Sequence, residues 1–149
     1  MAVSKHDAKY DSKYDALKLD NQICFPLYAA SREVIKKYRP YLDEIGLTYT
    51  QYIAMMVLWE QKKVSVKELG EKLFLDSGTL TPLLKTLEAK GYLRRHRDEN
   101  DERVLIVEIT EAGEALKEQA VEVPGKMAKC VSLSPEEAVQ LYTLLHKLL

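Results

Sequence analysis

The segment between residues 65 and 110 places the tightest constraint on the fold, because several structural signals follow one another closely there. Ser65 and Glu68 have the spacing of a capping box and predict a short helix that begins at Ser65. The sequence DSG at residues 76–78 predicts a capped turn, and a second helix follows it until Gly91. Two short helices joined by a tight turn match a helix-turn-helix, although an ordinary helical hairpin has the same pattern.

A basic strand, an acidic turn and a β-branched strand come directly after the second helix. Residues 92–97 have the sequence YLRRHR, residues 98–102 have the sequence DENDE, and residues 103–110 have the sequence RVLIVEIT. This order predicts a β-hairpin. A helix-turn-helix followed by such a hairpin is a winged helix.

The charge of this region indicates what a winged helix would bind. Residues 85–97 contain five Lys or Arg side chains and one acid, Glu88, which gives a local charge of +4 although the whole chain carries −1. Binding to DNA phosphates needs such a local excess of positive charge. We therefore expect Lys85, Arg95 and Arg97 to contact double-stranded DNA. The alternative is a charged hairpin that is merely solvated.

A helical pattern of apolar residues runs from Leu19 to about Tyr38, and Arg39-Pro40 predicts its end. Pro26 interrupts this pattern and leaves two alternatives open. If Pro26 lies in the first turn, the helix begins near Cys24, whose sulfur then faces the unpaired backbone N–H groups of that turn. If it does not, the helix is kinked and Cys24 precedes the kink.

Further helices are predicted on both sides of the winged helix. Thr48 and Gln51 form a capping-box pattern before a helix that is apolar on nearly all sides and should therefore be buried. Thr110 caps a helix that is predicted to run to Pro124-Gly125. Ser134, followed by Pro and two Glu, gives a strong start signal for the last helix. That helix carries an apolar stripe, from which we expect a homodimer.

The length and composition of the chain exclude several classes of protein. The chain has 149 residues, the size of one domain, and no apolar run that could span a membrane or serve as a signal peptide, so we expect a cytoplasmic protein. Cys24 and Cys130 have neither the spacing of a zinc site nor the number of a disulfide framework, so they are either inert or redox-active. No phosphate-binding loop, metal cluster or hydrolase-type nucleophile and base is present, so we expect no cofactor, no metal and no enzyme.

Four stretches closely match the sequences of a known family: residues 19–33, 47–60, 67–91 and 101–110. They resemble the MarR family of dimeric winged-helix regulators, and they are closest to its organic-hydroperoxide-sensing branch, the OhrR repressors. The resemblance implies a mainly α fold with a small β-hairpin wing, assembled as a MarR-like dimer. It also implies a transcriptional repressor that releases its operator when an organic hydroperoxide oxidises it.

The resemblance assigns roles to residues of a thiol sensor. Cys24 matches the peroxide-reactive cysteine, and Tyr38 and Tyr49 match the tyrosines that hydrogen-bond its sulfur. Cys130 resembles the resolving cysteine of a two-cysteine subset. Tyr38 lies 14 positions beyond Cys24, or roughly 21 Å along a straight helix. The two side chains can therefore meet only if the first helices of two subunits run antiparallel.

The resemblance also assigns DNA contacts. Ser77, Thr79 and Thr81 fall on the recognition helix that enters the major groove. Asp101 and Arg103 match a wing pair in which the acid orients the arginine toward the minor groove.

The predicted division of the chain follows from these roles. Residues 1–18 are expected to be a flexible tail, and residues 19–149 a single MarR-like domain. Within that domain, residues 19–47 and 111–149 are expected to dimerise, and residues 48–110 to bind DNA.

Two further functions compete with the hydroperoxide sensor. A MarR-type regulator that responds to a small aromatic ligand, or to another oxidant, would not use peroxide chemistry at Cys24. A thiol peroxidase would turn peroxide over with a reductant, but the basic wing has no purpose in such an enzyme.

Overall fold

The computed structural model describes residues 13–149, and the chain divides into two compact units between Lys37 and Tyr38. Most of the predicted tail, residues 1–18, therefore lies outside the described residues. The first unit contains two short 3-10 turns, η1 (Asp15–Leu17) and η2 (Leu19–Asn21), and the first part of helix α1.

Helix α1 (Cys24–Glu44) differs from the predicted helix at its C-terminal end. It begins at Cys24, so Pro26 lies in the first turn, as the first of the two alternatives required. It does not end at Pro40 as predicted, but continues to Glu44. Pro40 removes one backbone hydrogen bond, whereas continuation of the helix buries Leu42 in the core, where only 2% of it is exposed. The burial of an apolar side chain therefore outweighs the local signal.

Helix α2 (Tyr49–Gln61) is the buried centre of the second unit. Its predicted capping box is confirmed, because Thr48 and Gln51 each accept a hydrogen bond from the backbone of the other. Trp59 Nε1 donates a hydrogen bond of 2.8 Å to the carbonyl of Gly113 and so joins α2 to α5. The side chains that α2 buries include Tyr52, Ala54, Met55, Leu58 and Trp59.

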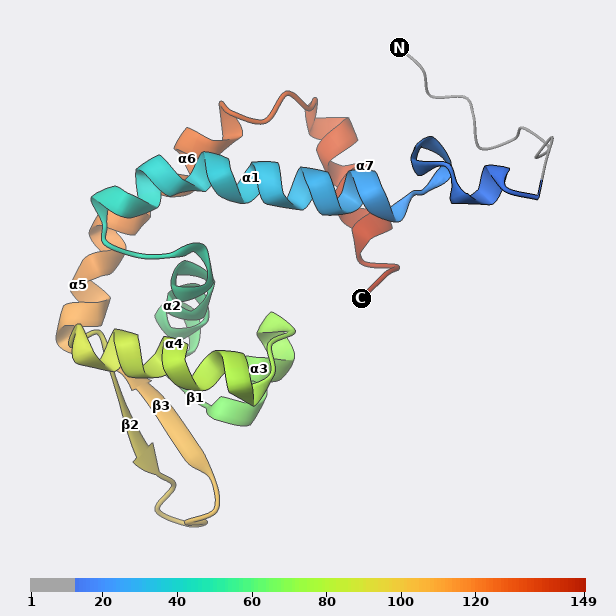
Figure 1. Cartoon of the computed structure of the whole chain (residues 1–149). Coiled ribbons are helices and arrows are strands. Elements are labelled where there is room, and N and C mark those ends of the chain that lie inside the picture. The colour runs from blue at the N-terminus through green and yellow to red at the C-terminus, as the bar shows by residue number, and fades with distance from the viewer. Residues whose placement is uncertain (1–12) are drawn as a thin grey trace. The chain divides into compact units, whose positions relative to one another are not determined.

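The predicted helix-turn-helix is formed by α3 (Val66–Leu73) and α4 (Ser77–Ala89), which pack against each other (Figure 1). The capping box of Ser65 and Glu68 begins α3 as predicted. Gly70 allows the close approach of the turn, because a Cβ atom there would lie 2.8 Å from the carbonyl oxygen of Leu75. The apolar face of α4 is buried through Leu80, Leu83, Leu84 and Leu87.

A three-stranded antiparallel sheet completes the winged helix, with the strand order β1-β3-β2 (Figure 1). The predicted hairpin is confirmed as β2 (Leu93–Arg97) and β3 (Leu105–Ile109). The sequence did not predict β1 (Lys63–Ser65), which has only three residues. Val107 lies fully buried on the central strand and anchors the sheet to the core.

Three helices follow the sheet: α5 (Glu111–Ala120), α6 (Val123–Ala128) and α7 (Pro135–Leu145). The prediction of one helix up to Pro124-Gly125 was wrong, because α5 ends earlier and Pro124 lies in the first turn of α6. The capping box at Ser134 begins α7 as predicted. No residue of α7 is buried. The fold is thus mainly α with a small wing, which confirms the predicted winged-helix class.

Candidate nucleic-acid interface and thiol sites

Helix α4 presents a polar stripe opposite its buried leucines. Asp76 caps the helix by accepting a hydrogen bond of 2.8 Å from the backbone N–H of Thr79. Ser77, Thr81 and Lys85 recur at steps of four residues and are exposed, so they share one face of the helix. Thr79 is also exposed, in the first turn. All four residues were predicted to contact DNA, and all four are exposed, although the Thr81 hydroxyl already donates a hydrogen bond of 2.8 Å to the carbonyl of Ser77.

The tip of the wing is held in a defined conformation by two aspartates. Asp98 Oδ1 accepts hydrogen bonds from the backbone N–H groups of Asn100 and Asp101 at 2.8 and 3.1 Å. Asp101 accepts hydrogen bonds from Nε and Nη2 of Arg103 at 3.0 and 3.1 Å, and the Arg103 side chain is 90% exposed. The guanidinium holds the pKa of the Asp101 carboxyl below its usual value. The carboxylate thus holds the guanidinium of Arg103 and leaves it accessible.

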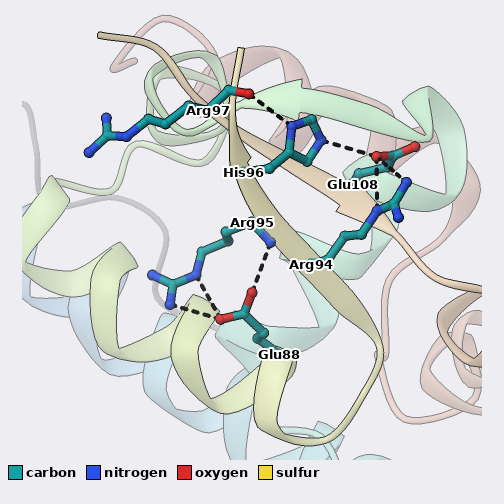
Figure 2. Close-up of polar contacts among 6 residues, drawn as sticks. All are labelled: Glu88, Arg94, Arg95, His96, Arg97 and Glu108. Carbon is teal, nitrogen blue, oxygen red and sulfur yellow. Dashed lines mark hydrogen bonds and ion pairs between the residues drawn. The ribbon is translucent and has the colours of Figure 1, made fainter. Parts of the chain in front are cut away.

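Arg95 turns toward α4 and contacts Glu88 (Figure 2). Its Nε and Nη2 donate to Glu88 Oε2 at 3.1 and 2.8 Å, and its backbone N–H donates to Glu88 Oε1 at 2.8 Å. These bonds lower the pKa of the Glu88 carboxyl. The Arg95 side chain is only 20% exposed. Arg95 was predicted to contact DNA, but in the structure its guanidinium is already paired with the carboxylate of Glu88.

Successive side chains of a strand point to opposite faces, so Arg94 and His96 lie on the other face of β2 (Figure 2). Both contact Glu108 Oε2 of β3, Arg94 through Nη2 at 2.9 Å and His96 through Nε2 at 3.1 Å. The strand register places Lys63 and Arg94 opposite Glu108 on its two sides. The bond from Arg94 and, less strongly, that from His96 lower the pKa of the Glu108 carboxyl. One carboxylate thus binds both Arg94 and His96 on this face.

The basic excess predicted for residues 85–97 is therefore partly used within the chain. Lys90 also makes an internal contact, with the carbonyl of Gly46 at 2.5 Å. Among the ion pairs of residues 13–149, none involves Lys85 or Arg97. Together with Arg103, these two exposed side chains are the cations best placed to neutralise phosphates.

Cys24 is the first residue of α1, and its side chain is exposed. The backbone N–H groups in the first turn of a helix have no partner within the helix and favour a negative charge nearby. The neighbouring apolar side chains Ile23, Phe25 and Leu27 are exposed as well, by 66%, 44% and 41%. A thiolate at this position would be approached across an apolar surface.

Tyr38 and Tyr49 belong to an aromatic cluster in the second unit. Their ring centroids are 5.0 Å apart, and the ring of Tyr52 lies 6.0 Å from that of Tyr38. Burial, and in second place the charge of Tyr49, raise the pKa of the Tyr38 phenol. A tyrosine hydroxyl can donate a hydrogen bond while it is protonated, and this shift favours the protonated form. The structure brings together the two tyrosines that the family resemblance assigned to the sensor.

Cys130 contacts a tyrosine that the sequence analysis did not single out. The hydroxyl of Tyr41 lies 3.2 Å from Cys130 Sγ, and the thiol lies 3.5 Å from the carbonyl oxygen of Lys126. The contact with the sulfur is the main reason why the pKa of Tyr41 is raised. Cys130 is half-buried. The two cysteines thus differ in their surroundings, since Cys24 is exposed.

Sequence reasoning missed three residues that organise these sites: Tyr41, Glu88 and Glu108. Alternation along β2 could have separated Arg94 and His96 from Arg95, but only the strand register shows that Glu108 faces the first two. Nothing in the sequence brings Tyr41 and Cys130 together, since 89 positions separate them.

Neither a metal site nor a membrane span is found in residues 13–149. No group of three or more His, Cys, Asp or Glu side chains there could hold a metal ion. No helix in this part of the chain is long and apolar enough to cross a membrane.

Comparison with known proteins gives consistent matches. A family model described as transcriptional regulator SarA/Rot matches residues 32–120. The organic hydroperoxide resistance transcriptional regulator of Bacillus subtilis (strain 168) is 48% identical over 139 residues, which cover 93% of this chain and 95% of that protein. The HTH-type transcriptional regulator SarZ of Staphylococcus aureus (strain USA300) is 49% identical over 120 residues, which cover 80% and 81%.

Solved structures of AbfR, a protein of Staphylococcus epidermidis, resemble the fold closely. AbfR bound to DNA is known in a reduced and in an overoxidized form. Both have a TM-score of 0.76 and 34% sequence identity, and they cover 92% and 91% of this chain and 96% of AbfR.

Proposed function

The chain belongs to the SarA/Rot family of transcriptional regulators, and from this premise we propose that it is a repressor which releases its operator when an organic hydroperoxide oxidises Cys24. It is a redox-sensing, DNA-binding regulator of the MarR type and not an enzyme. It acts in the cytoplasm.

DNA binding by this chain is supported above all by the exposed Arg103, which Asp101 holds at the wing tip. In our proposal the wing enters a minor groove while Ser77, Thr79 and Thr81 of α4 face the adjacent major groove. Lys85 and Arg97 neutralise phosphates beside them. We assign DNA binding to residues 48–110.

We assign dimerisation to residues 19–47 and 111–149. Helix α1 exposes Phe25, Leu27 and Tyr28, and α7 exposes apolar side chains although it buries none. Apolar surfaces of this kind are typical of an interface between subunits. A homodimer with two-fold symmetry would read a pseudo-palindromic operator, one half-site per subunit.

In this dimer the sensor is shared between subunits. Tyr38 lies 14 positions after Cys24 in α1, which corresponds to roughly 21 Å. We therefore place Cys24 of one protomer beside the partner subunit's Tyr38 and Tyr49. Their hydroxyls would donate hydrogen bonds to the thiolate and hold it for attack.

The sensing reaction has two steps. The Cys24 thiolate attacks one peroxide oxygen, the O–O bond breaks, and the products are a sulfenic acid and, after protonation of the leaving alkoxide, an alcohol. The Cys130 thiol then attacks the sulfenic sulfur, so that an S–S bond forms and water leaves. A disulfide needs the two Cα atoms within about 7 Å, so the segments that carry the cysteines must move if they start farther apart. We propose that this movement separates the two DNA-reading parts from their half-sites.

The proposal is tested by fluorescence anisotropy with DNA from upstream of the chain's own gene. The reduced protein should bind, one equivalent of cumene hydroperoxide should release the DNA, and excess dithiothreitol should restore binding. Cys24→Ser should bind DNA equally well and ignore the peroxide. Cys130→Ser should still form the sulfenic acid, detectable with dimedone, but release DNA more slowly. Release of DNA by peroxide from the Cys24→Ser variant would rule out the sensor.

A further inference from the structure

We propose that Glu88 and Arg95 form a clamp that sets the angle between the recognition helix α4 and the wing, and that Arg95 supports operator binding through this clamp without contacting DNA. The proposal rests on the DNA-binding function proposed above. It assigns Arg95, one of the basic residues expected at the interface, to positioning, and it gives Glu88 a role in DNA binding.

The clamp joins α4 to β2 through both the backbone and the side chain of Arg95. Glu88 lies in the last turn of α4, and Arg95 lies in the middle of β2 (Figure 2). One carboxylate oxygen accepts the backbone N–H of Arg95, and the other accepts its guanidinium through Nε and Nη2. The backbone bond fixes the position of the strand, while the planar guanidinium fixes its orientation. Lysine has no such planar fork and could not replace it.

The connection outside the clamp is short and contains a glycine in the left-handed region. Only Lys90, Gly91 and Tyr92 link α4 to β2, and Gly91 has a φ of +81°, which favours glycine. The buried side chains Leu87 and Leu93 hold the two ends to the core. The clamp is therefore a direct polar contact between α4 and β2 that opposes rotation of the hairpin about this link, in addition to the pairing of β3 with β1.

Arg95 differs from Arg103, the arginine at the wing tip, in how far its side chain is exposed. The Arg95 side chain is 20% exposed and that of Arg103 is 90% exposed. If Arg95 turned to a phosphate, Glu88 would lose its partner and would remain as a carboxylate beside the DNA. Like charges repel each other, so this exchange is unfavourable.

The position of the clamp explains why it matters for binding. Ser77, Thr81 and Lys85 are exposed on α4, and Glu88 follows Lys85 by less than one helical turn. Arg97 lies two residues beyond Arg95 on the same face of β2, toward the wing tip. A small rotation at the clamp is therefore amplified at Arg103, which is at the far end of the hairpin.

The test compares Glu88→Gln with the matched control Glu71→Gln, which removes an exposed acid of α3 that forms no ion pair among the described residues. Operator affinity is measured by anisotropy over a range of salt concentrations. We expect Glu88→Gln to bind on the order of tenfold more weakly, although it removes a negative charge near DNA. Glu71→Gln should bind as well as the wild type or slightly better.

Arg95 variants distinguish a clamp from a direct contact. Arg95→Lys should bind about as weakly as Arg95→Ala, and neither should change the salt dependence. A direct phosphate contact would instead leave Arg95→Lys close to wild type, while Arg95→Ala would reduce the salt slope by about 1. In an Arg103→Ala background, Glu88→Gln should have little further effect, because the wing then has no tip contact to position. Thermal unfolding of each variant shows whether a loss of binding merely reflects a loss of folding.

The possible results separate the two proposals. A wild-type protein that does not bind operator DNA would overturn the proposed function, and the clamp with it. Wild-type binding together with tighter binding by Glu88→Gln would overturn the clamp alone. Full additivity of Glu88→Gln and Arg103→Ala would also overturn it.

Discussion

The DNA-reading region and the thiol region differ in how much of each is complete within one chain. In the winged helix, the carboxylates of Glu88, Asp101 and Glu108 each hold an arginine of the same chain. In α1 and α7, by contrast, apolar side chains lie exposed. The arginines of the first region thus have carboxylate partners within the chain, whereas the second region leaves apolar side chains exposed.

This difference indicates how the proposed switch is divided. The winged helix can be a rigid reader, because its own charges fix its geometry. In our proposal the sensor depends on the assembly of two subunits, because Tyr38 lies 14 positions after Cys24 in α1. Oxidation then needs to change only the relation between two rigid readers and not the readers themselves.

The largest effect is expected from a variant that removes the second subunit from the proposed dimer. Leu144 of α7 is 58% exposed within one chain, so Leu144→Glu should leave the fold intact and prevent dimerisation. A monomer contacts only one half-site and should bind on the order of 10²- to 10⁴-fold more weakly. Light scattering gives the mass, and anisotropy gives the affinity. Leu17→Glu, at a site 80% exposed outside the residues assigned to dimerisation, is the control. A monomeric variant with full affinity would contradict the proposed dimer.

A smaller effect is expected within the winged helix. Arg103→Ala should weaken operator binding by about 1–3 kcal/mol, the cost of one specific contact. The side chain is 90% exposed, so the melting temperature should not change. Asp101→Asn should lose part of the same affinity, because the arginine keeps its charge but loses its orientation. Operator titrations of both variants provide the measurement, and unchanged affinity of Arg103→Ala would remove the wing tip from the interface.

The smallest effect concerns the pH dependence of stability, which tests whether the ion pairs within the winged helix stabilise it. Arg95 lowers the folded-state pKa of Glu88, and Arg94 lowers that of Glu108, from an ordinary value of 4.5. A lowered folded-state pKa contributes stability above pH 4.5, and this stability is lost as the pH falls through the folded-state values. Exposed ion pairs contribute little to stability, so we expect a small effect.

Thermal unfolding above and below pH 4.5 measures this contribution. The variant that combines Glu88→Gln and Glu108→Gln should lose less stability on acidification than the wild type. An equal loss in both proteins would show that other carboxyl groups determine the acid response.

Local signals in the sequence predicted much of the fold. The capping boxes at Thr48, Ser65 and Ser134 each mark the start of a helix, because they satisfy backbone groups within a few residues. The prediction failed at Pro40, where a local signal to end the helix was outweighed by the burial of Leu42. Burial depends on the tertiary fold, and a single local pattern does not contain it.

The candidate site follows the same division. The exposed positions of α4 follow from helical periodicity, and the pair Asp101 and Arg103 lies within three residues of the chain. Arg95 could not be assigned from sequence, because a basic residue in a basic segment suggests phosphate contact until its partner Glu88 is known. The contact of Tyr41 with Cys130 depends on the packing of distant segments.

The hydrogen bond from Trp59 to the carbonyl of Gly113 provides an optical probe inside the molecule. The chain contains a single tryptophan, and its indole is 7% exposed where α2 meets α5. Its emission should therefore report on one junction only, between the core helix and the C-terminal helices. If oxidation shifts α5 against α2, the emission should move to longer wavelength as water reaches the indole. If oxidation moves the two helices together, the spectrum should stay the same while DNA is released.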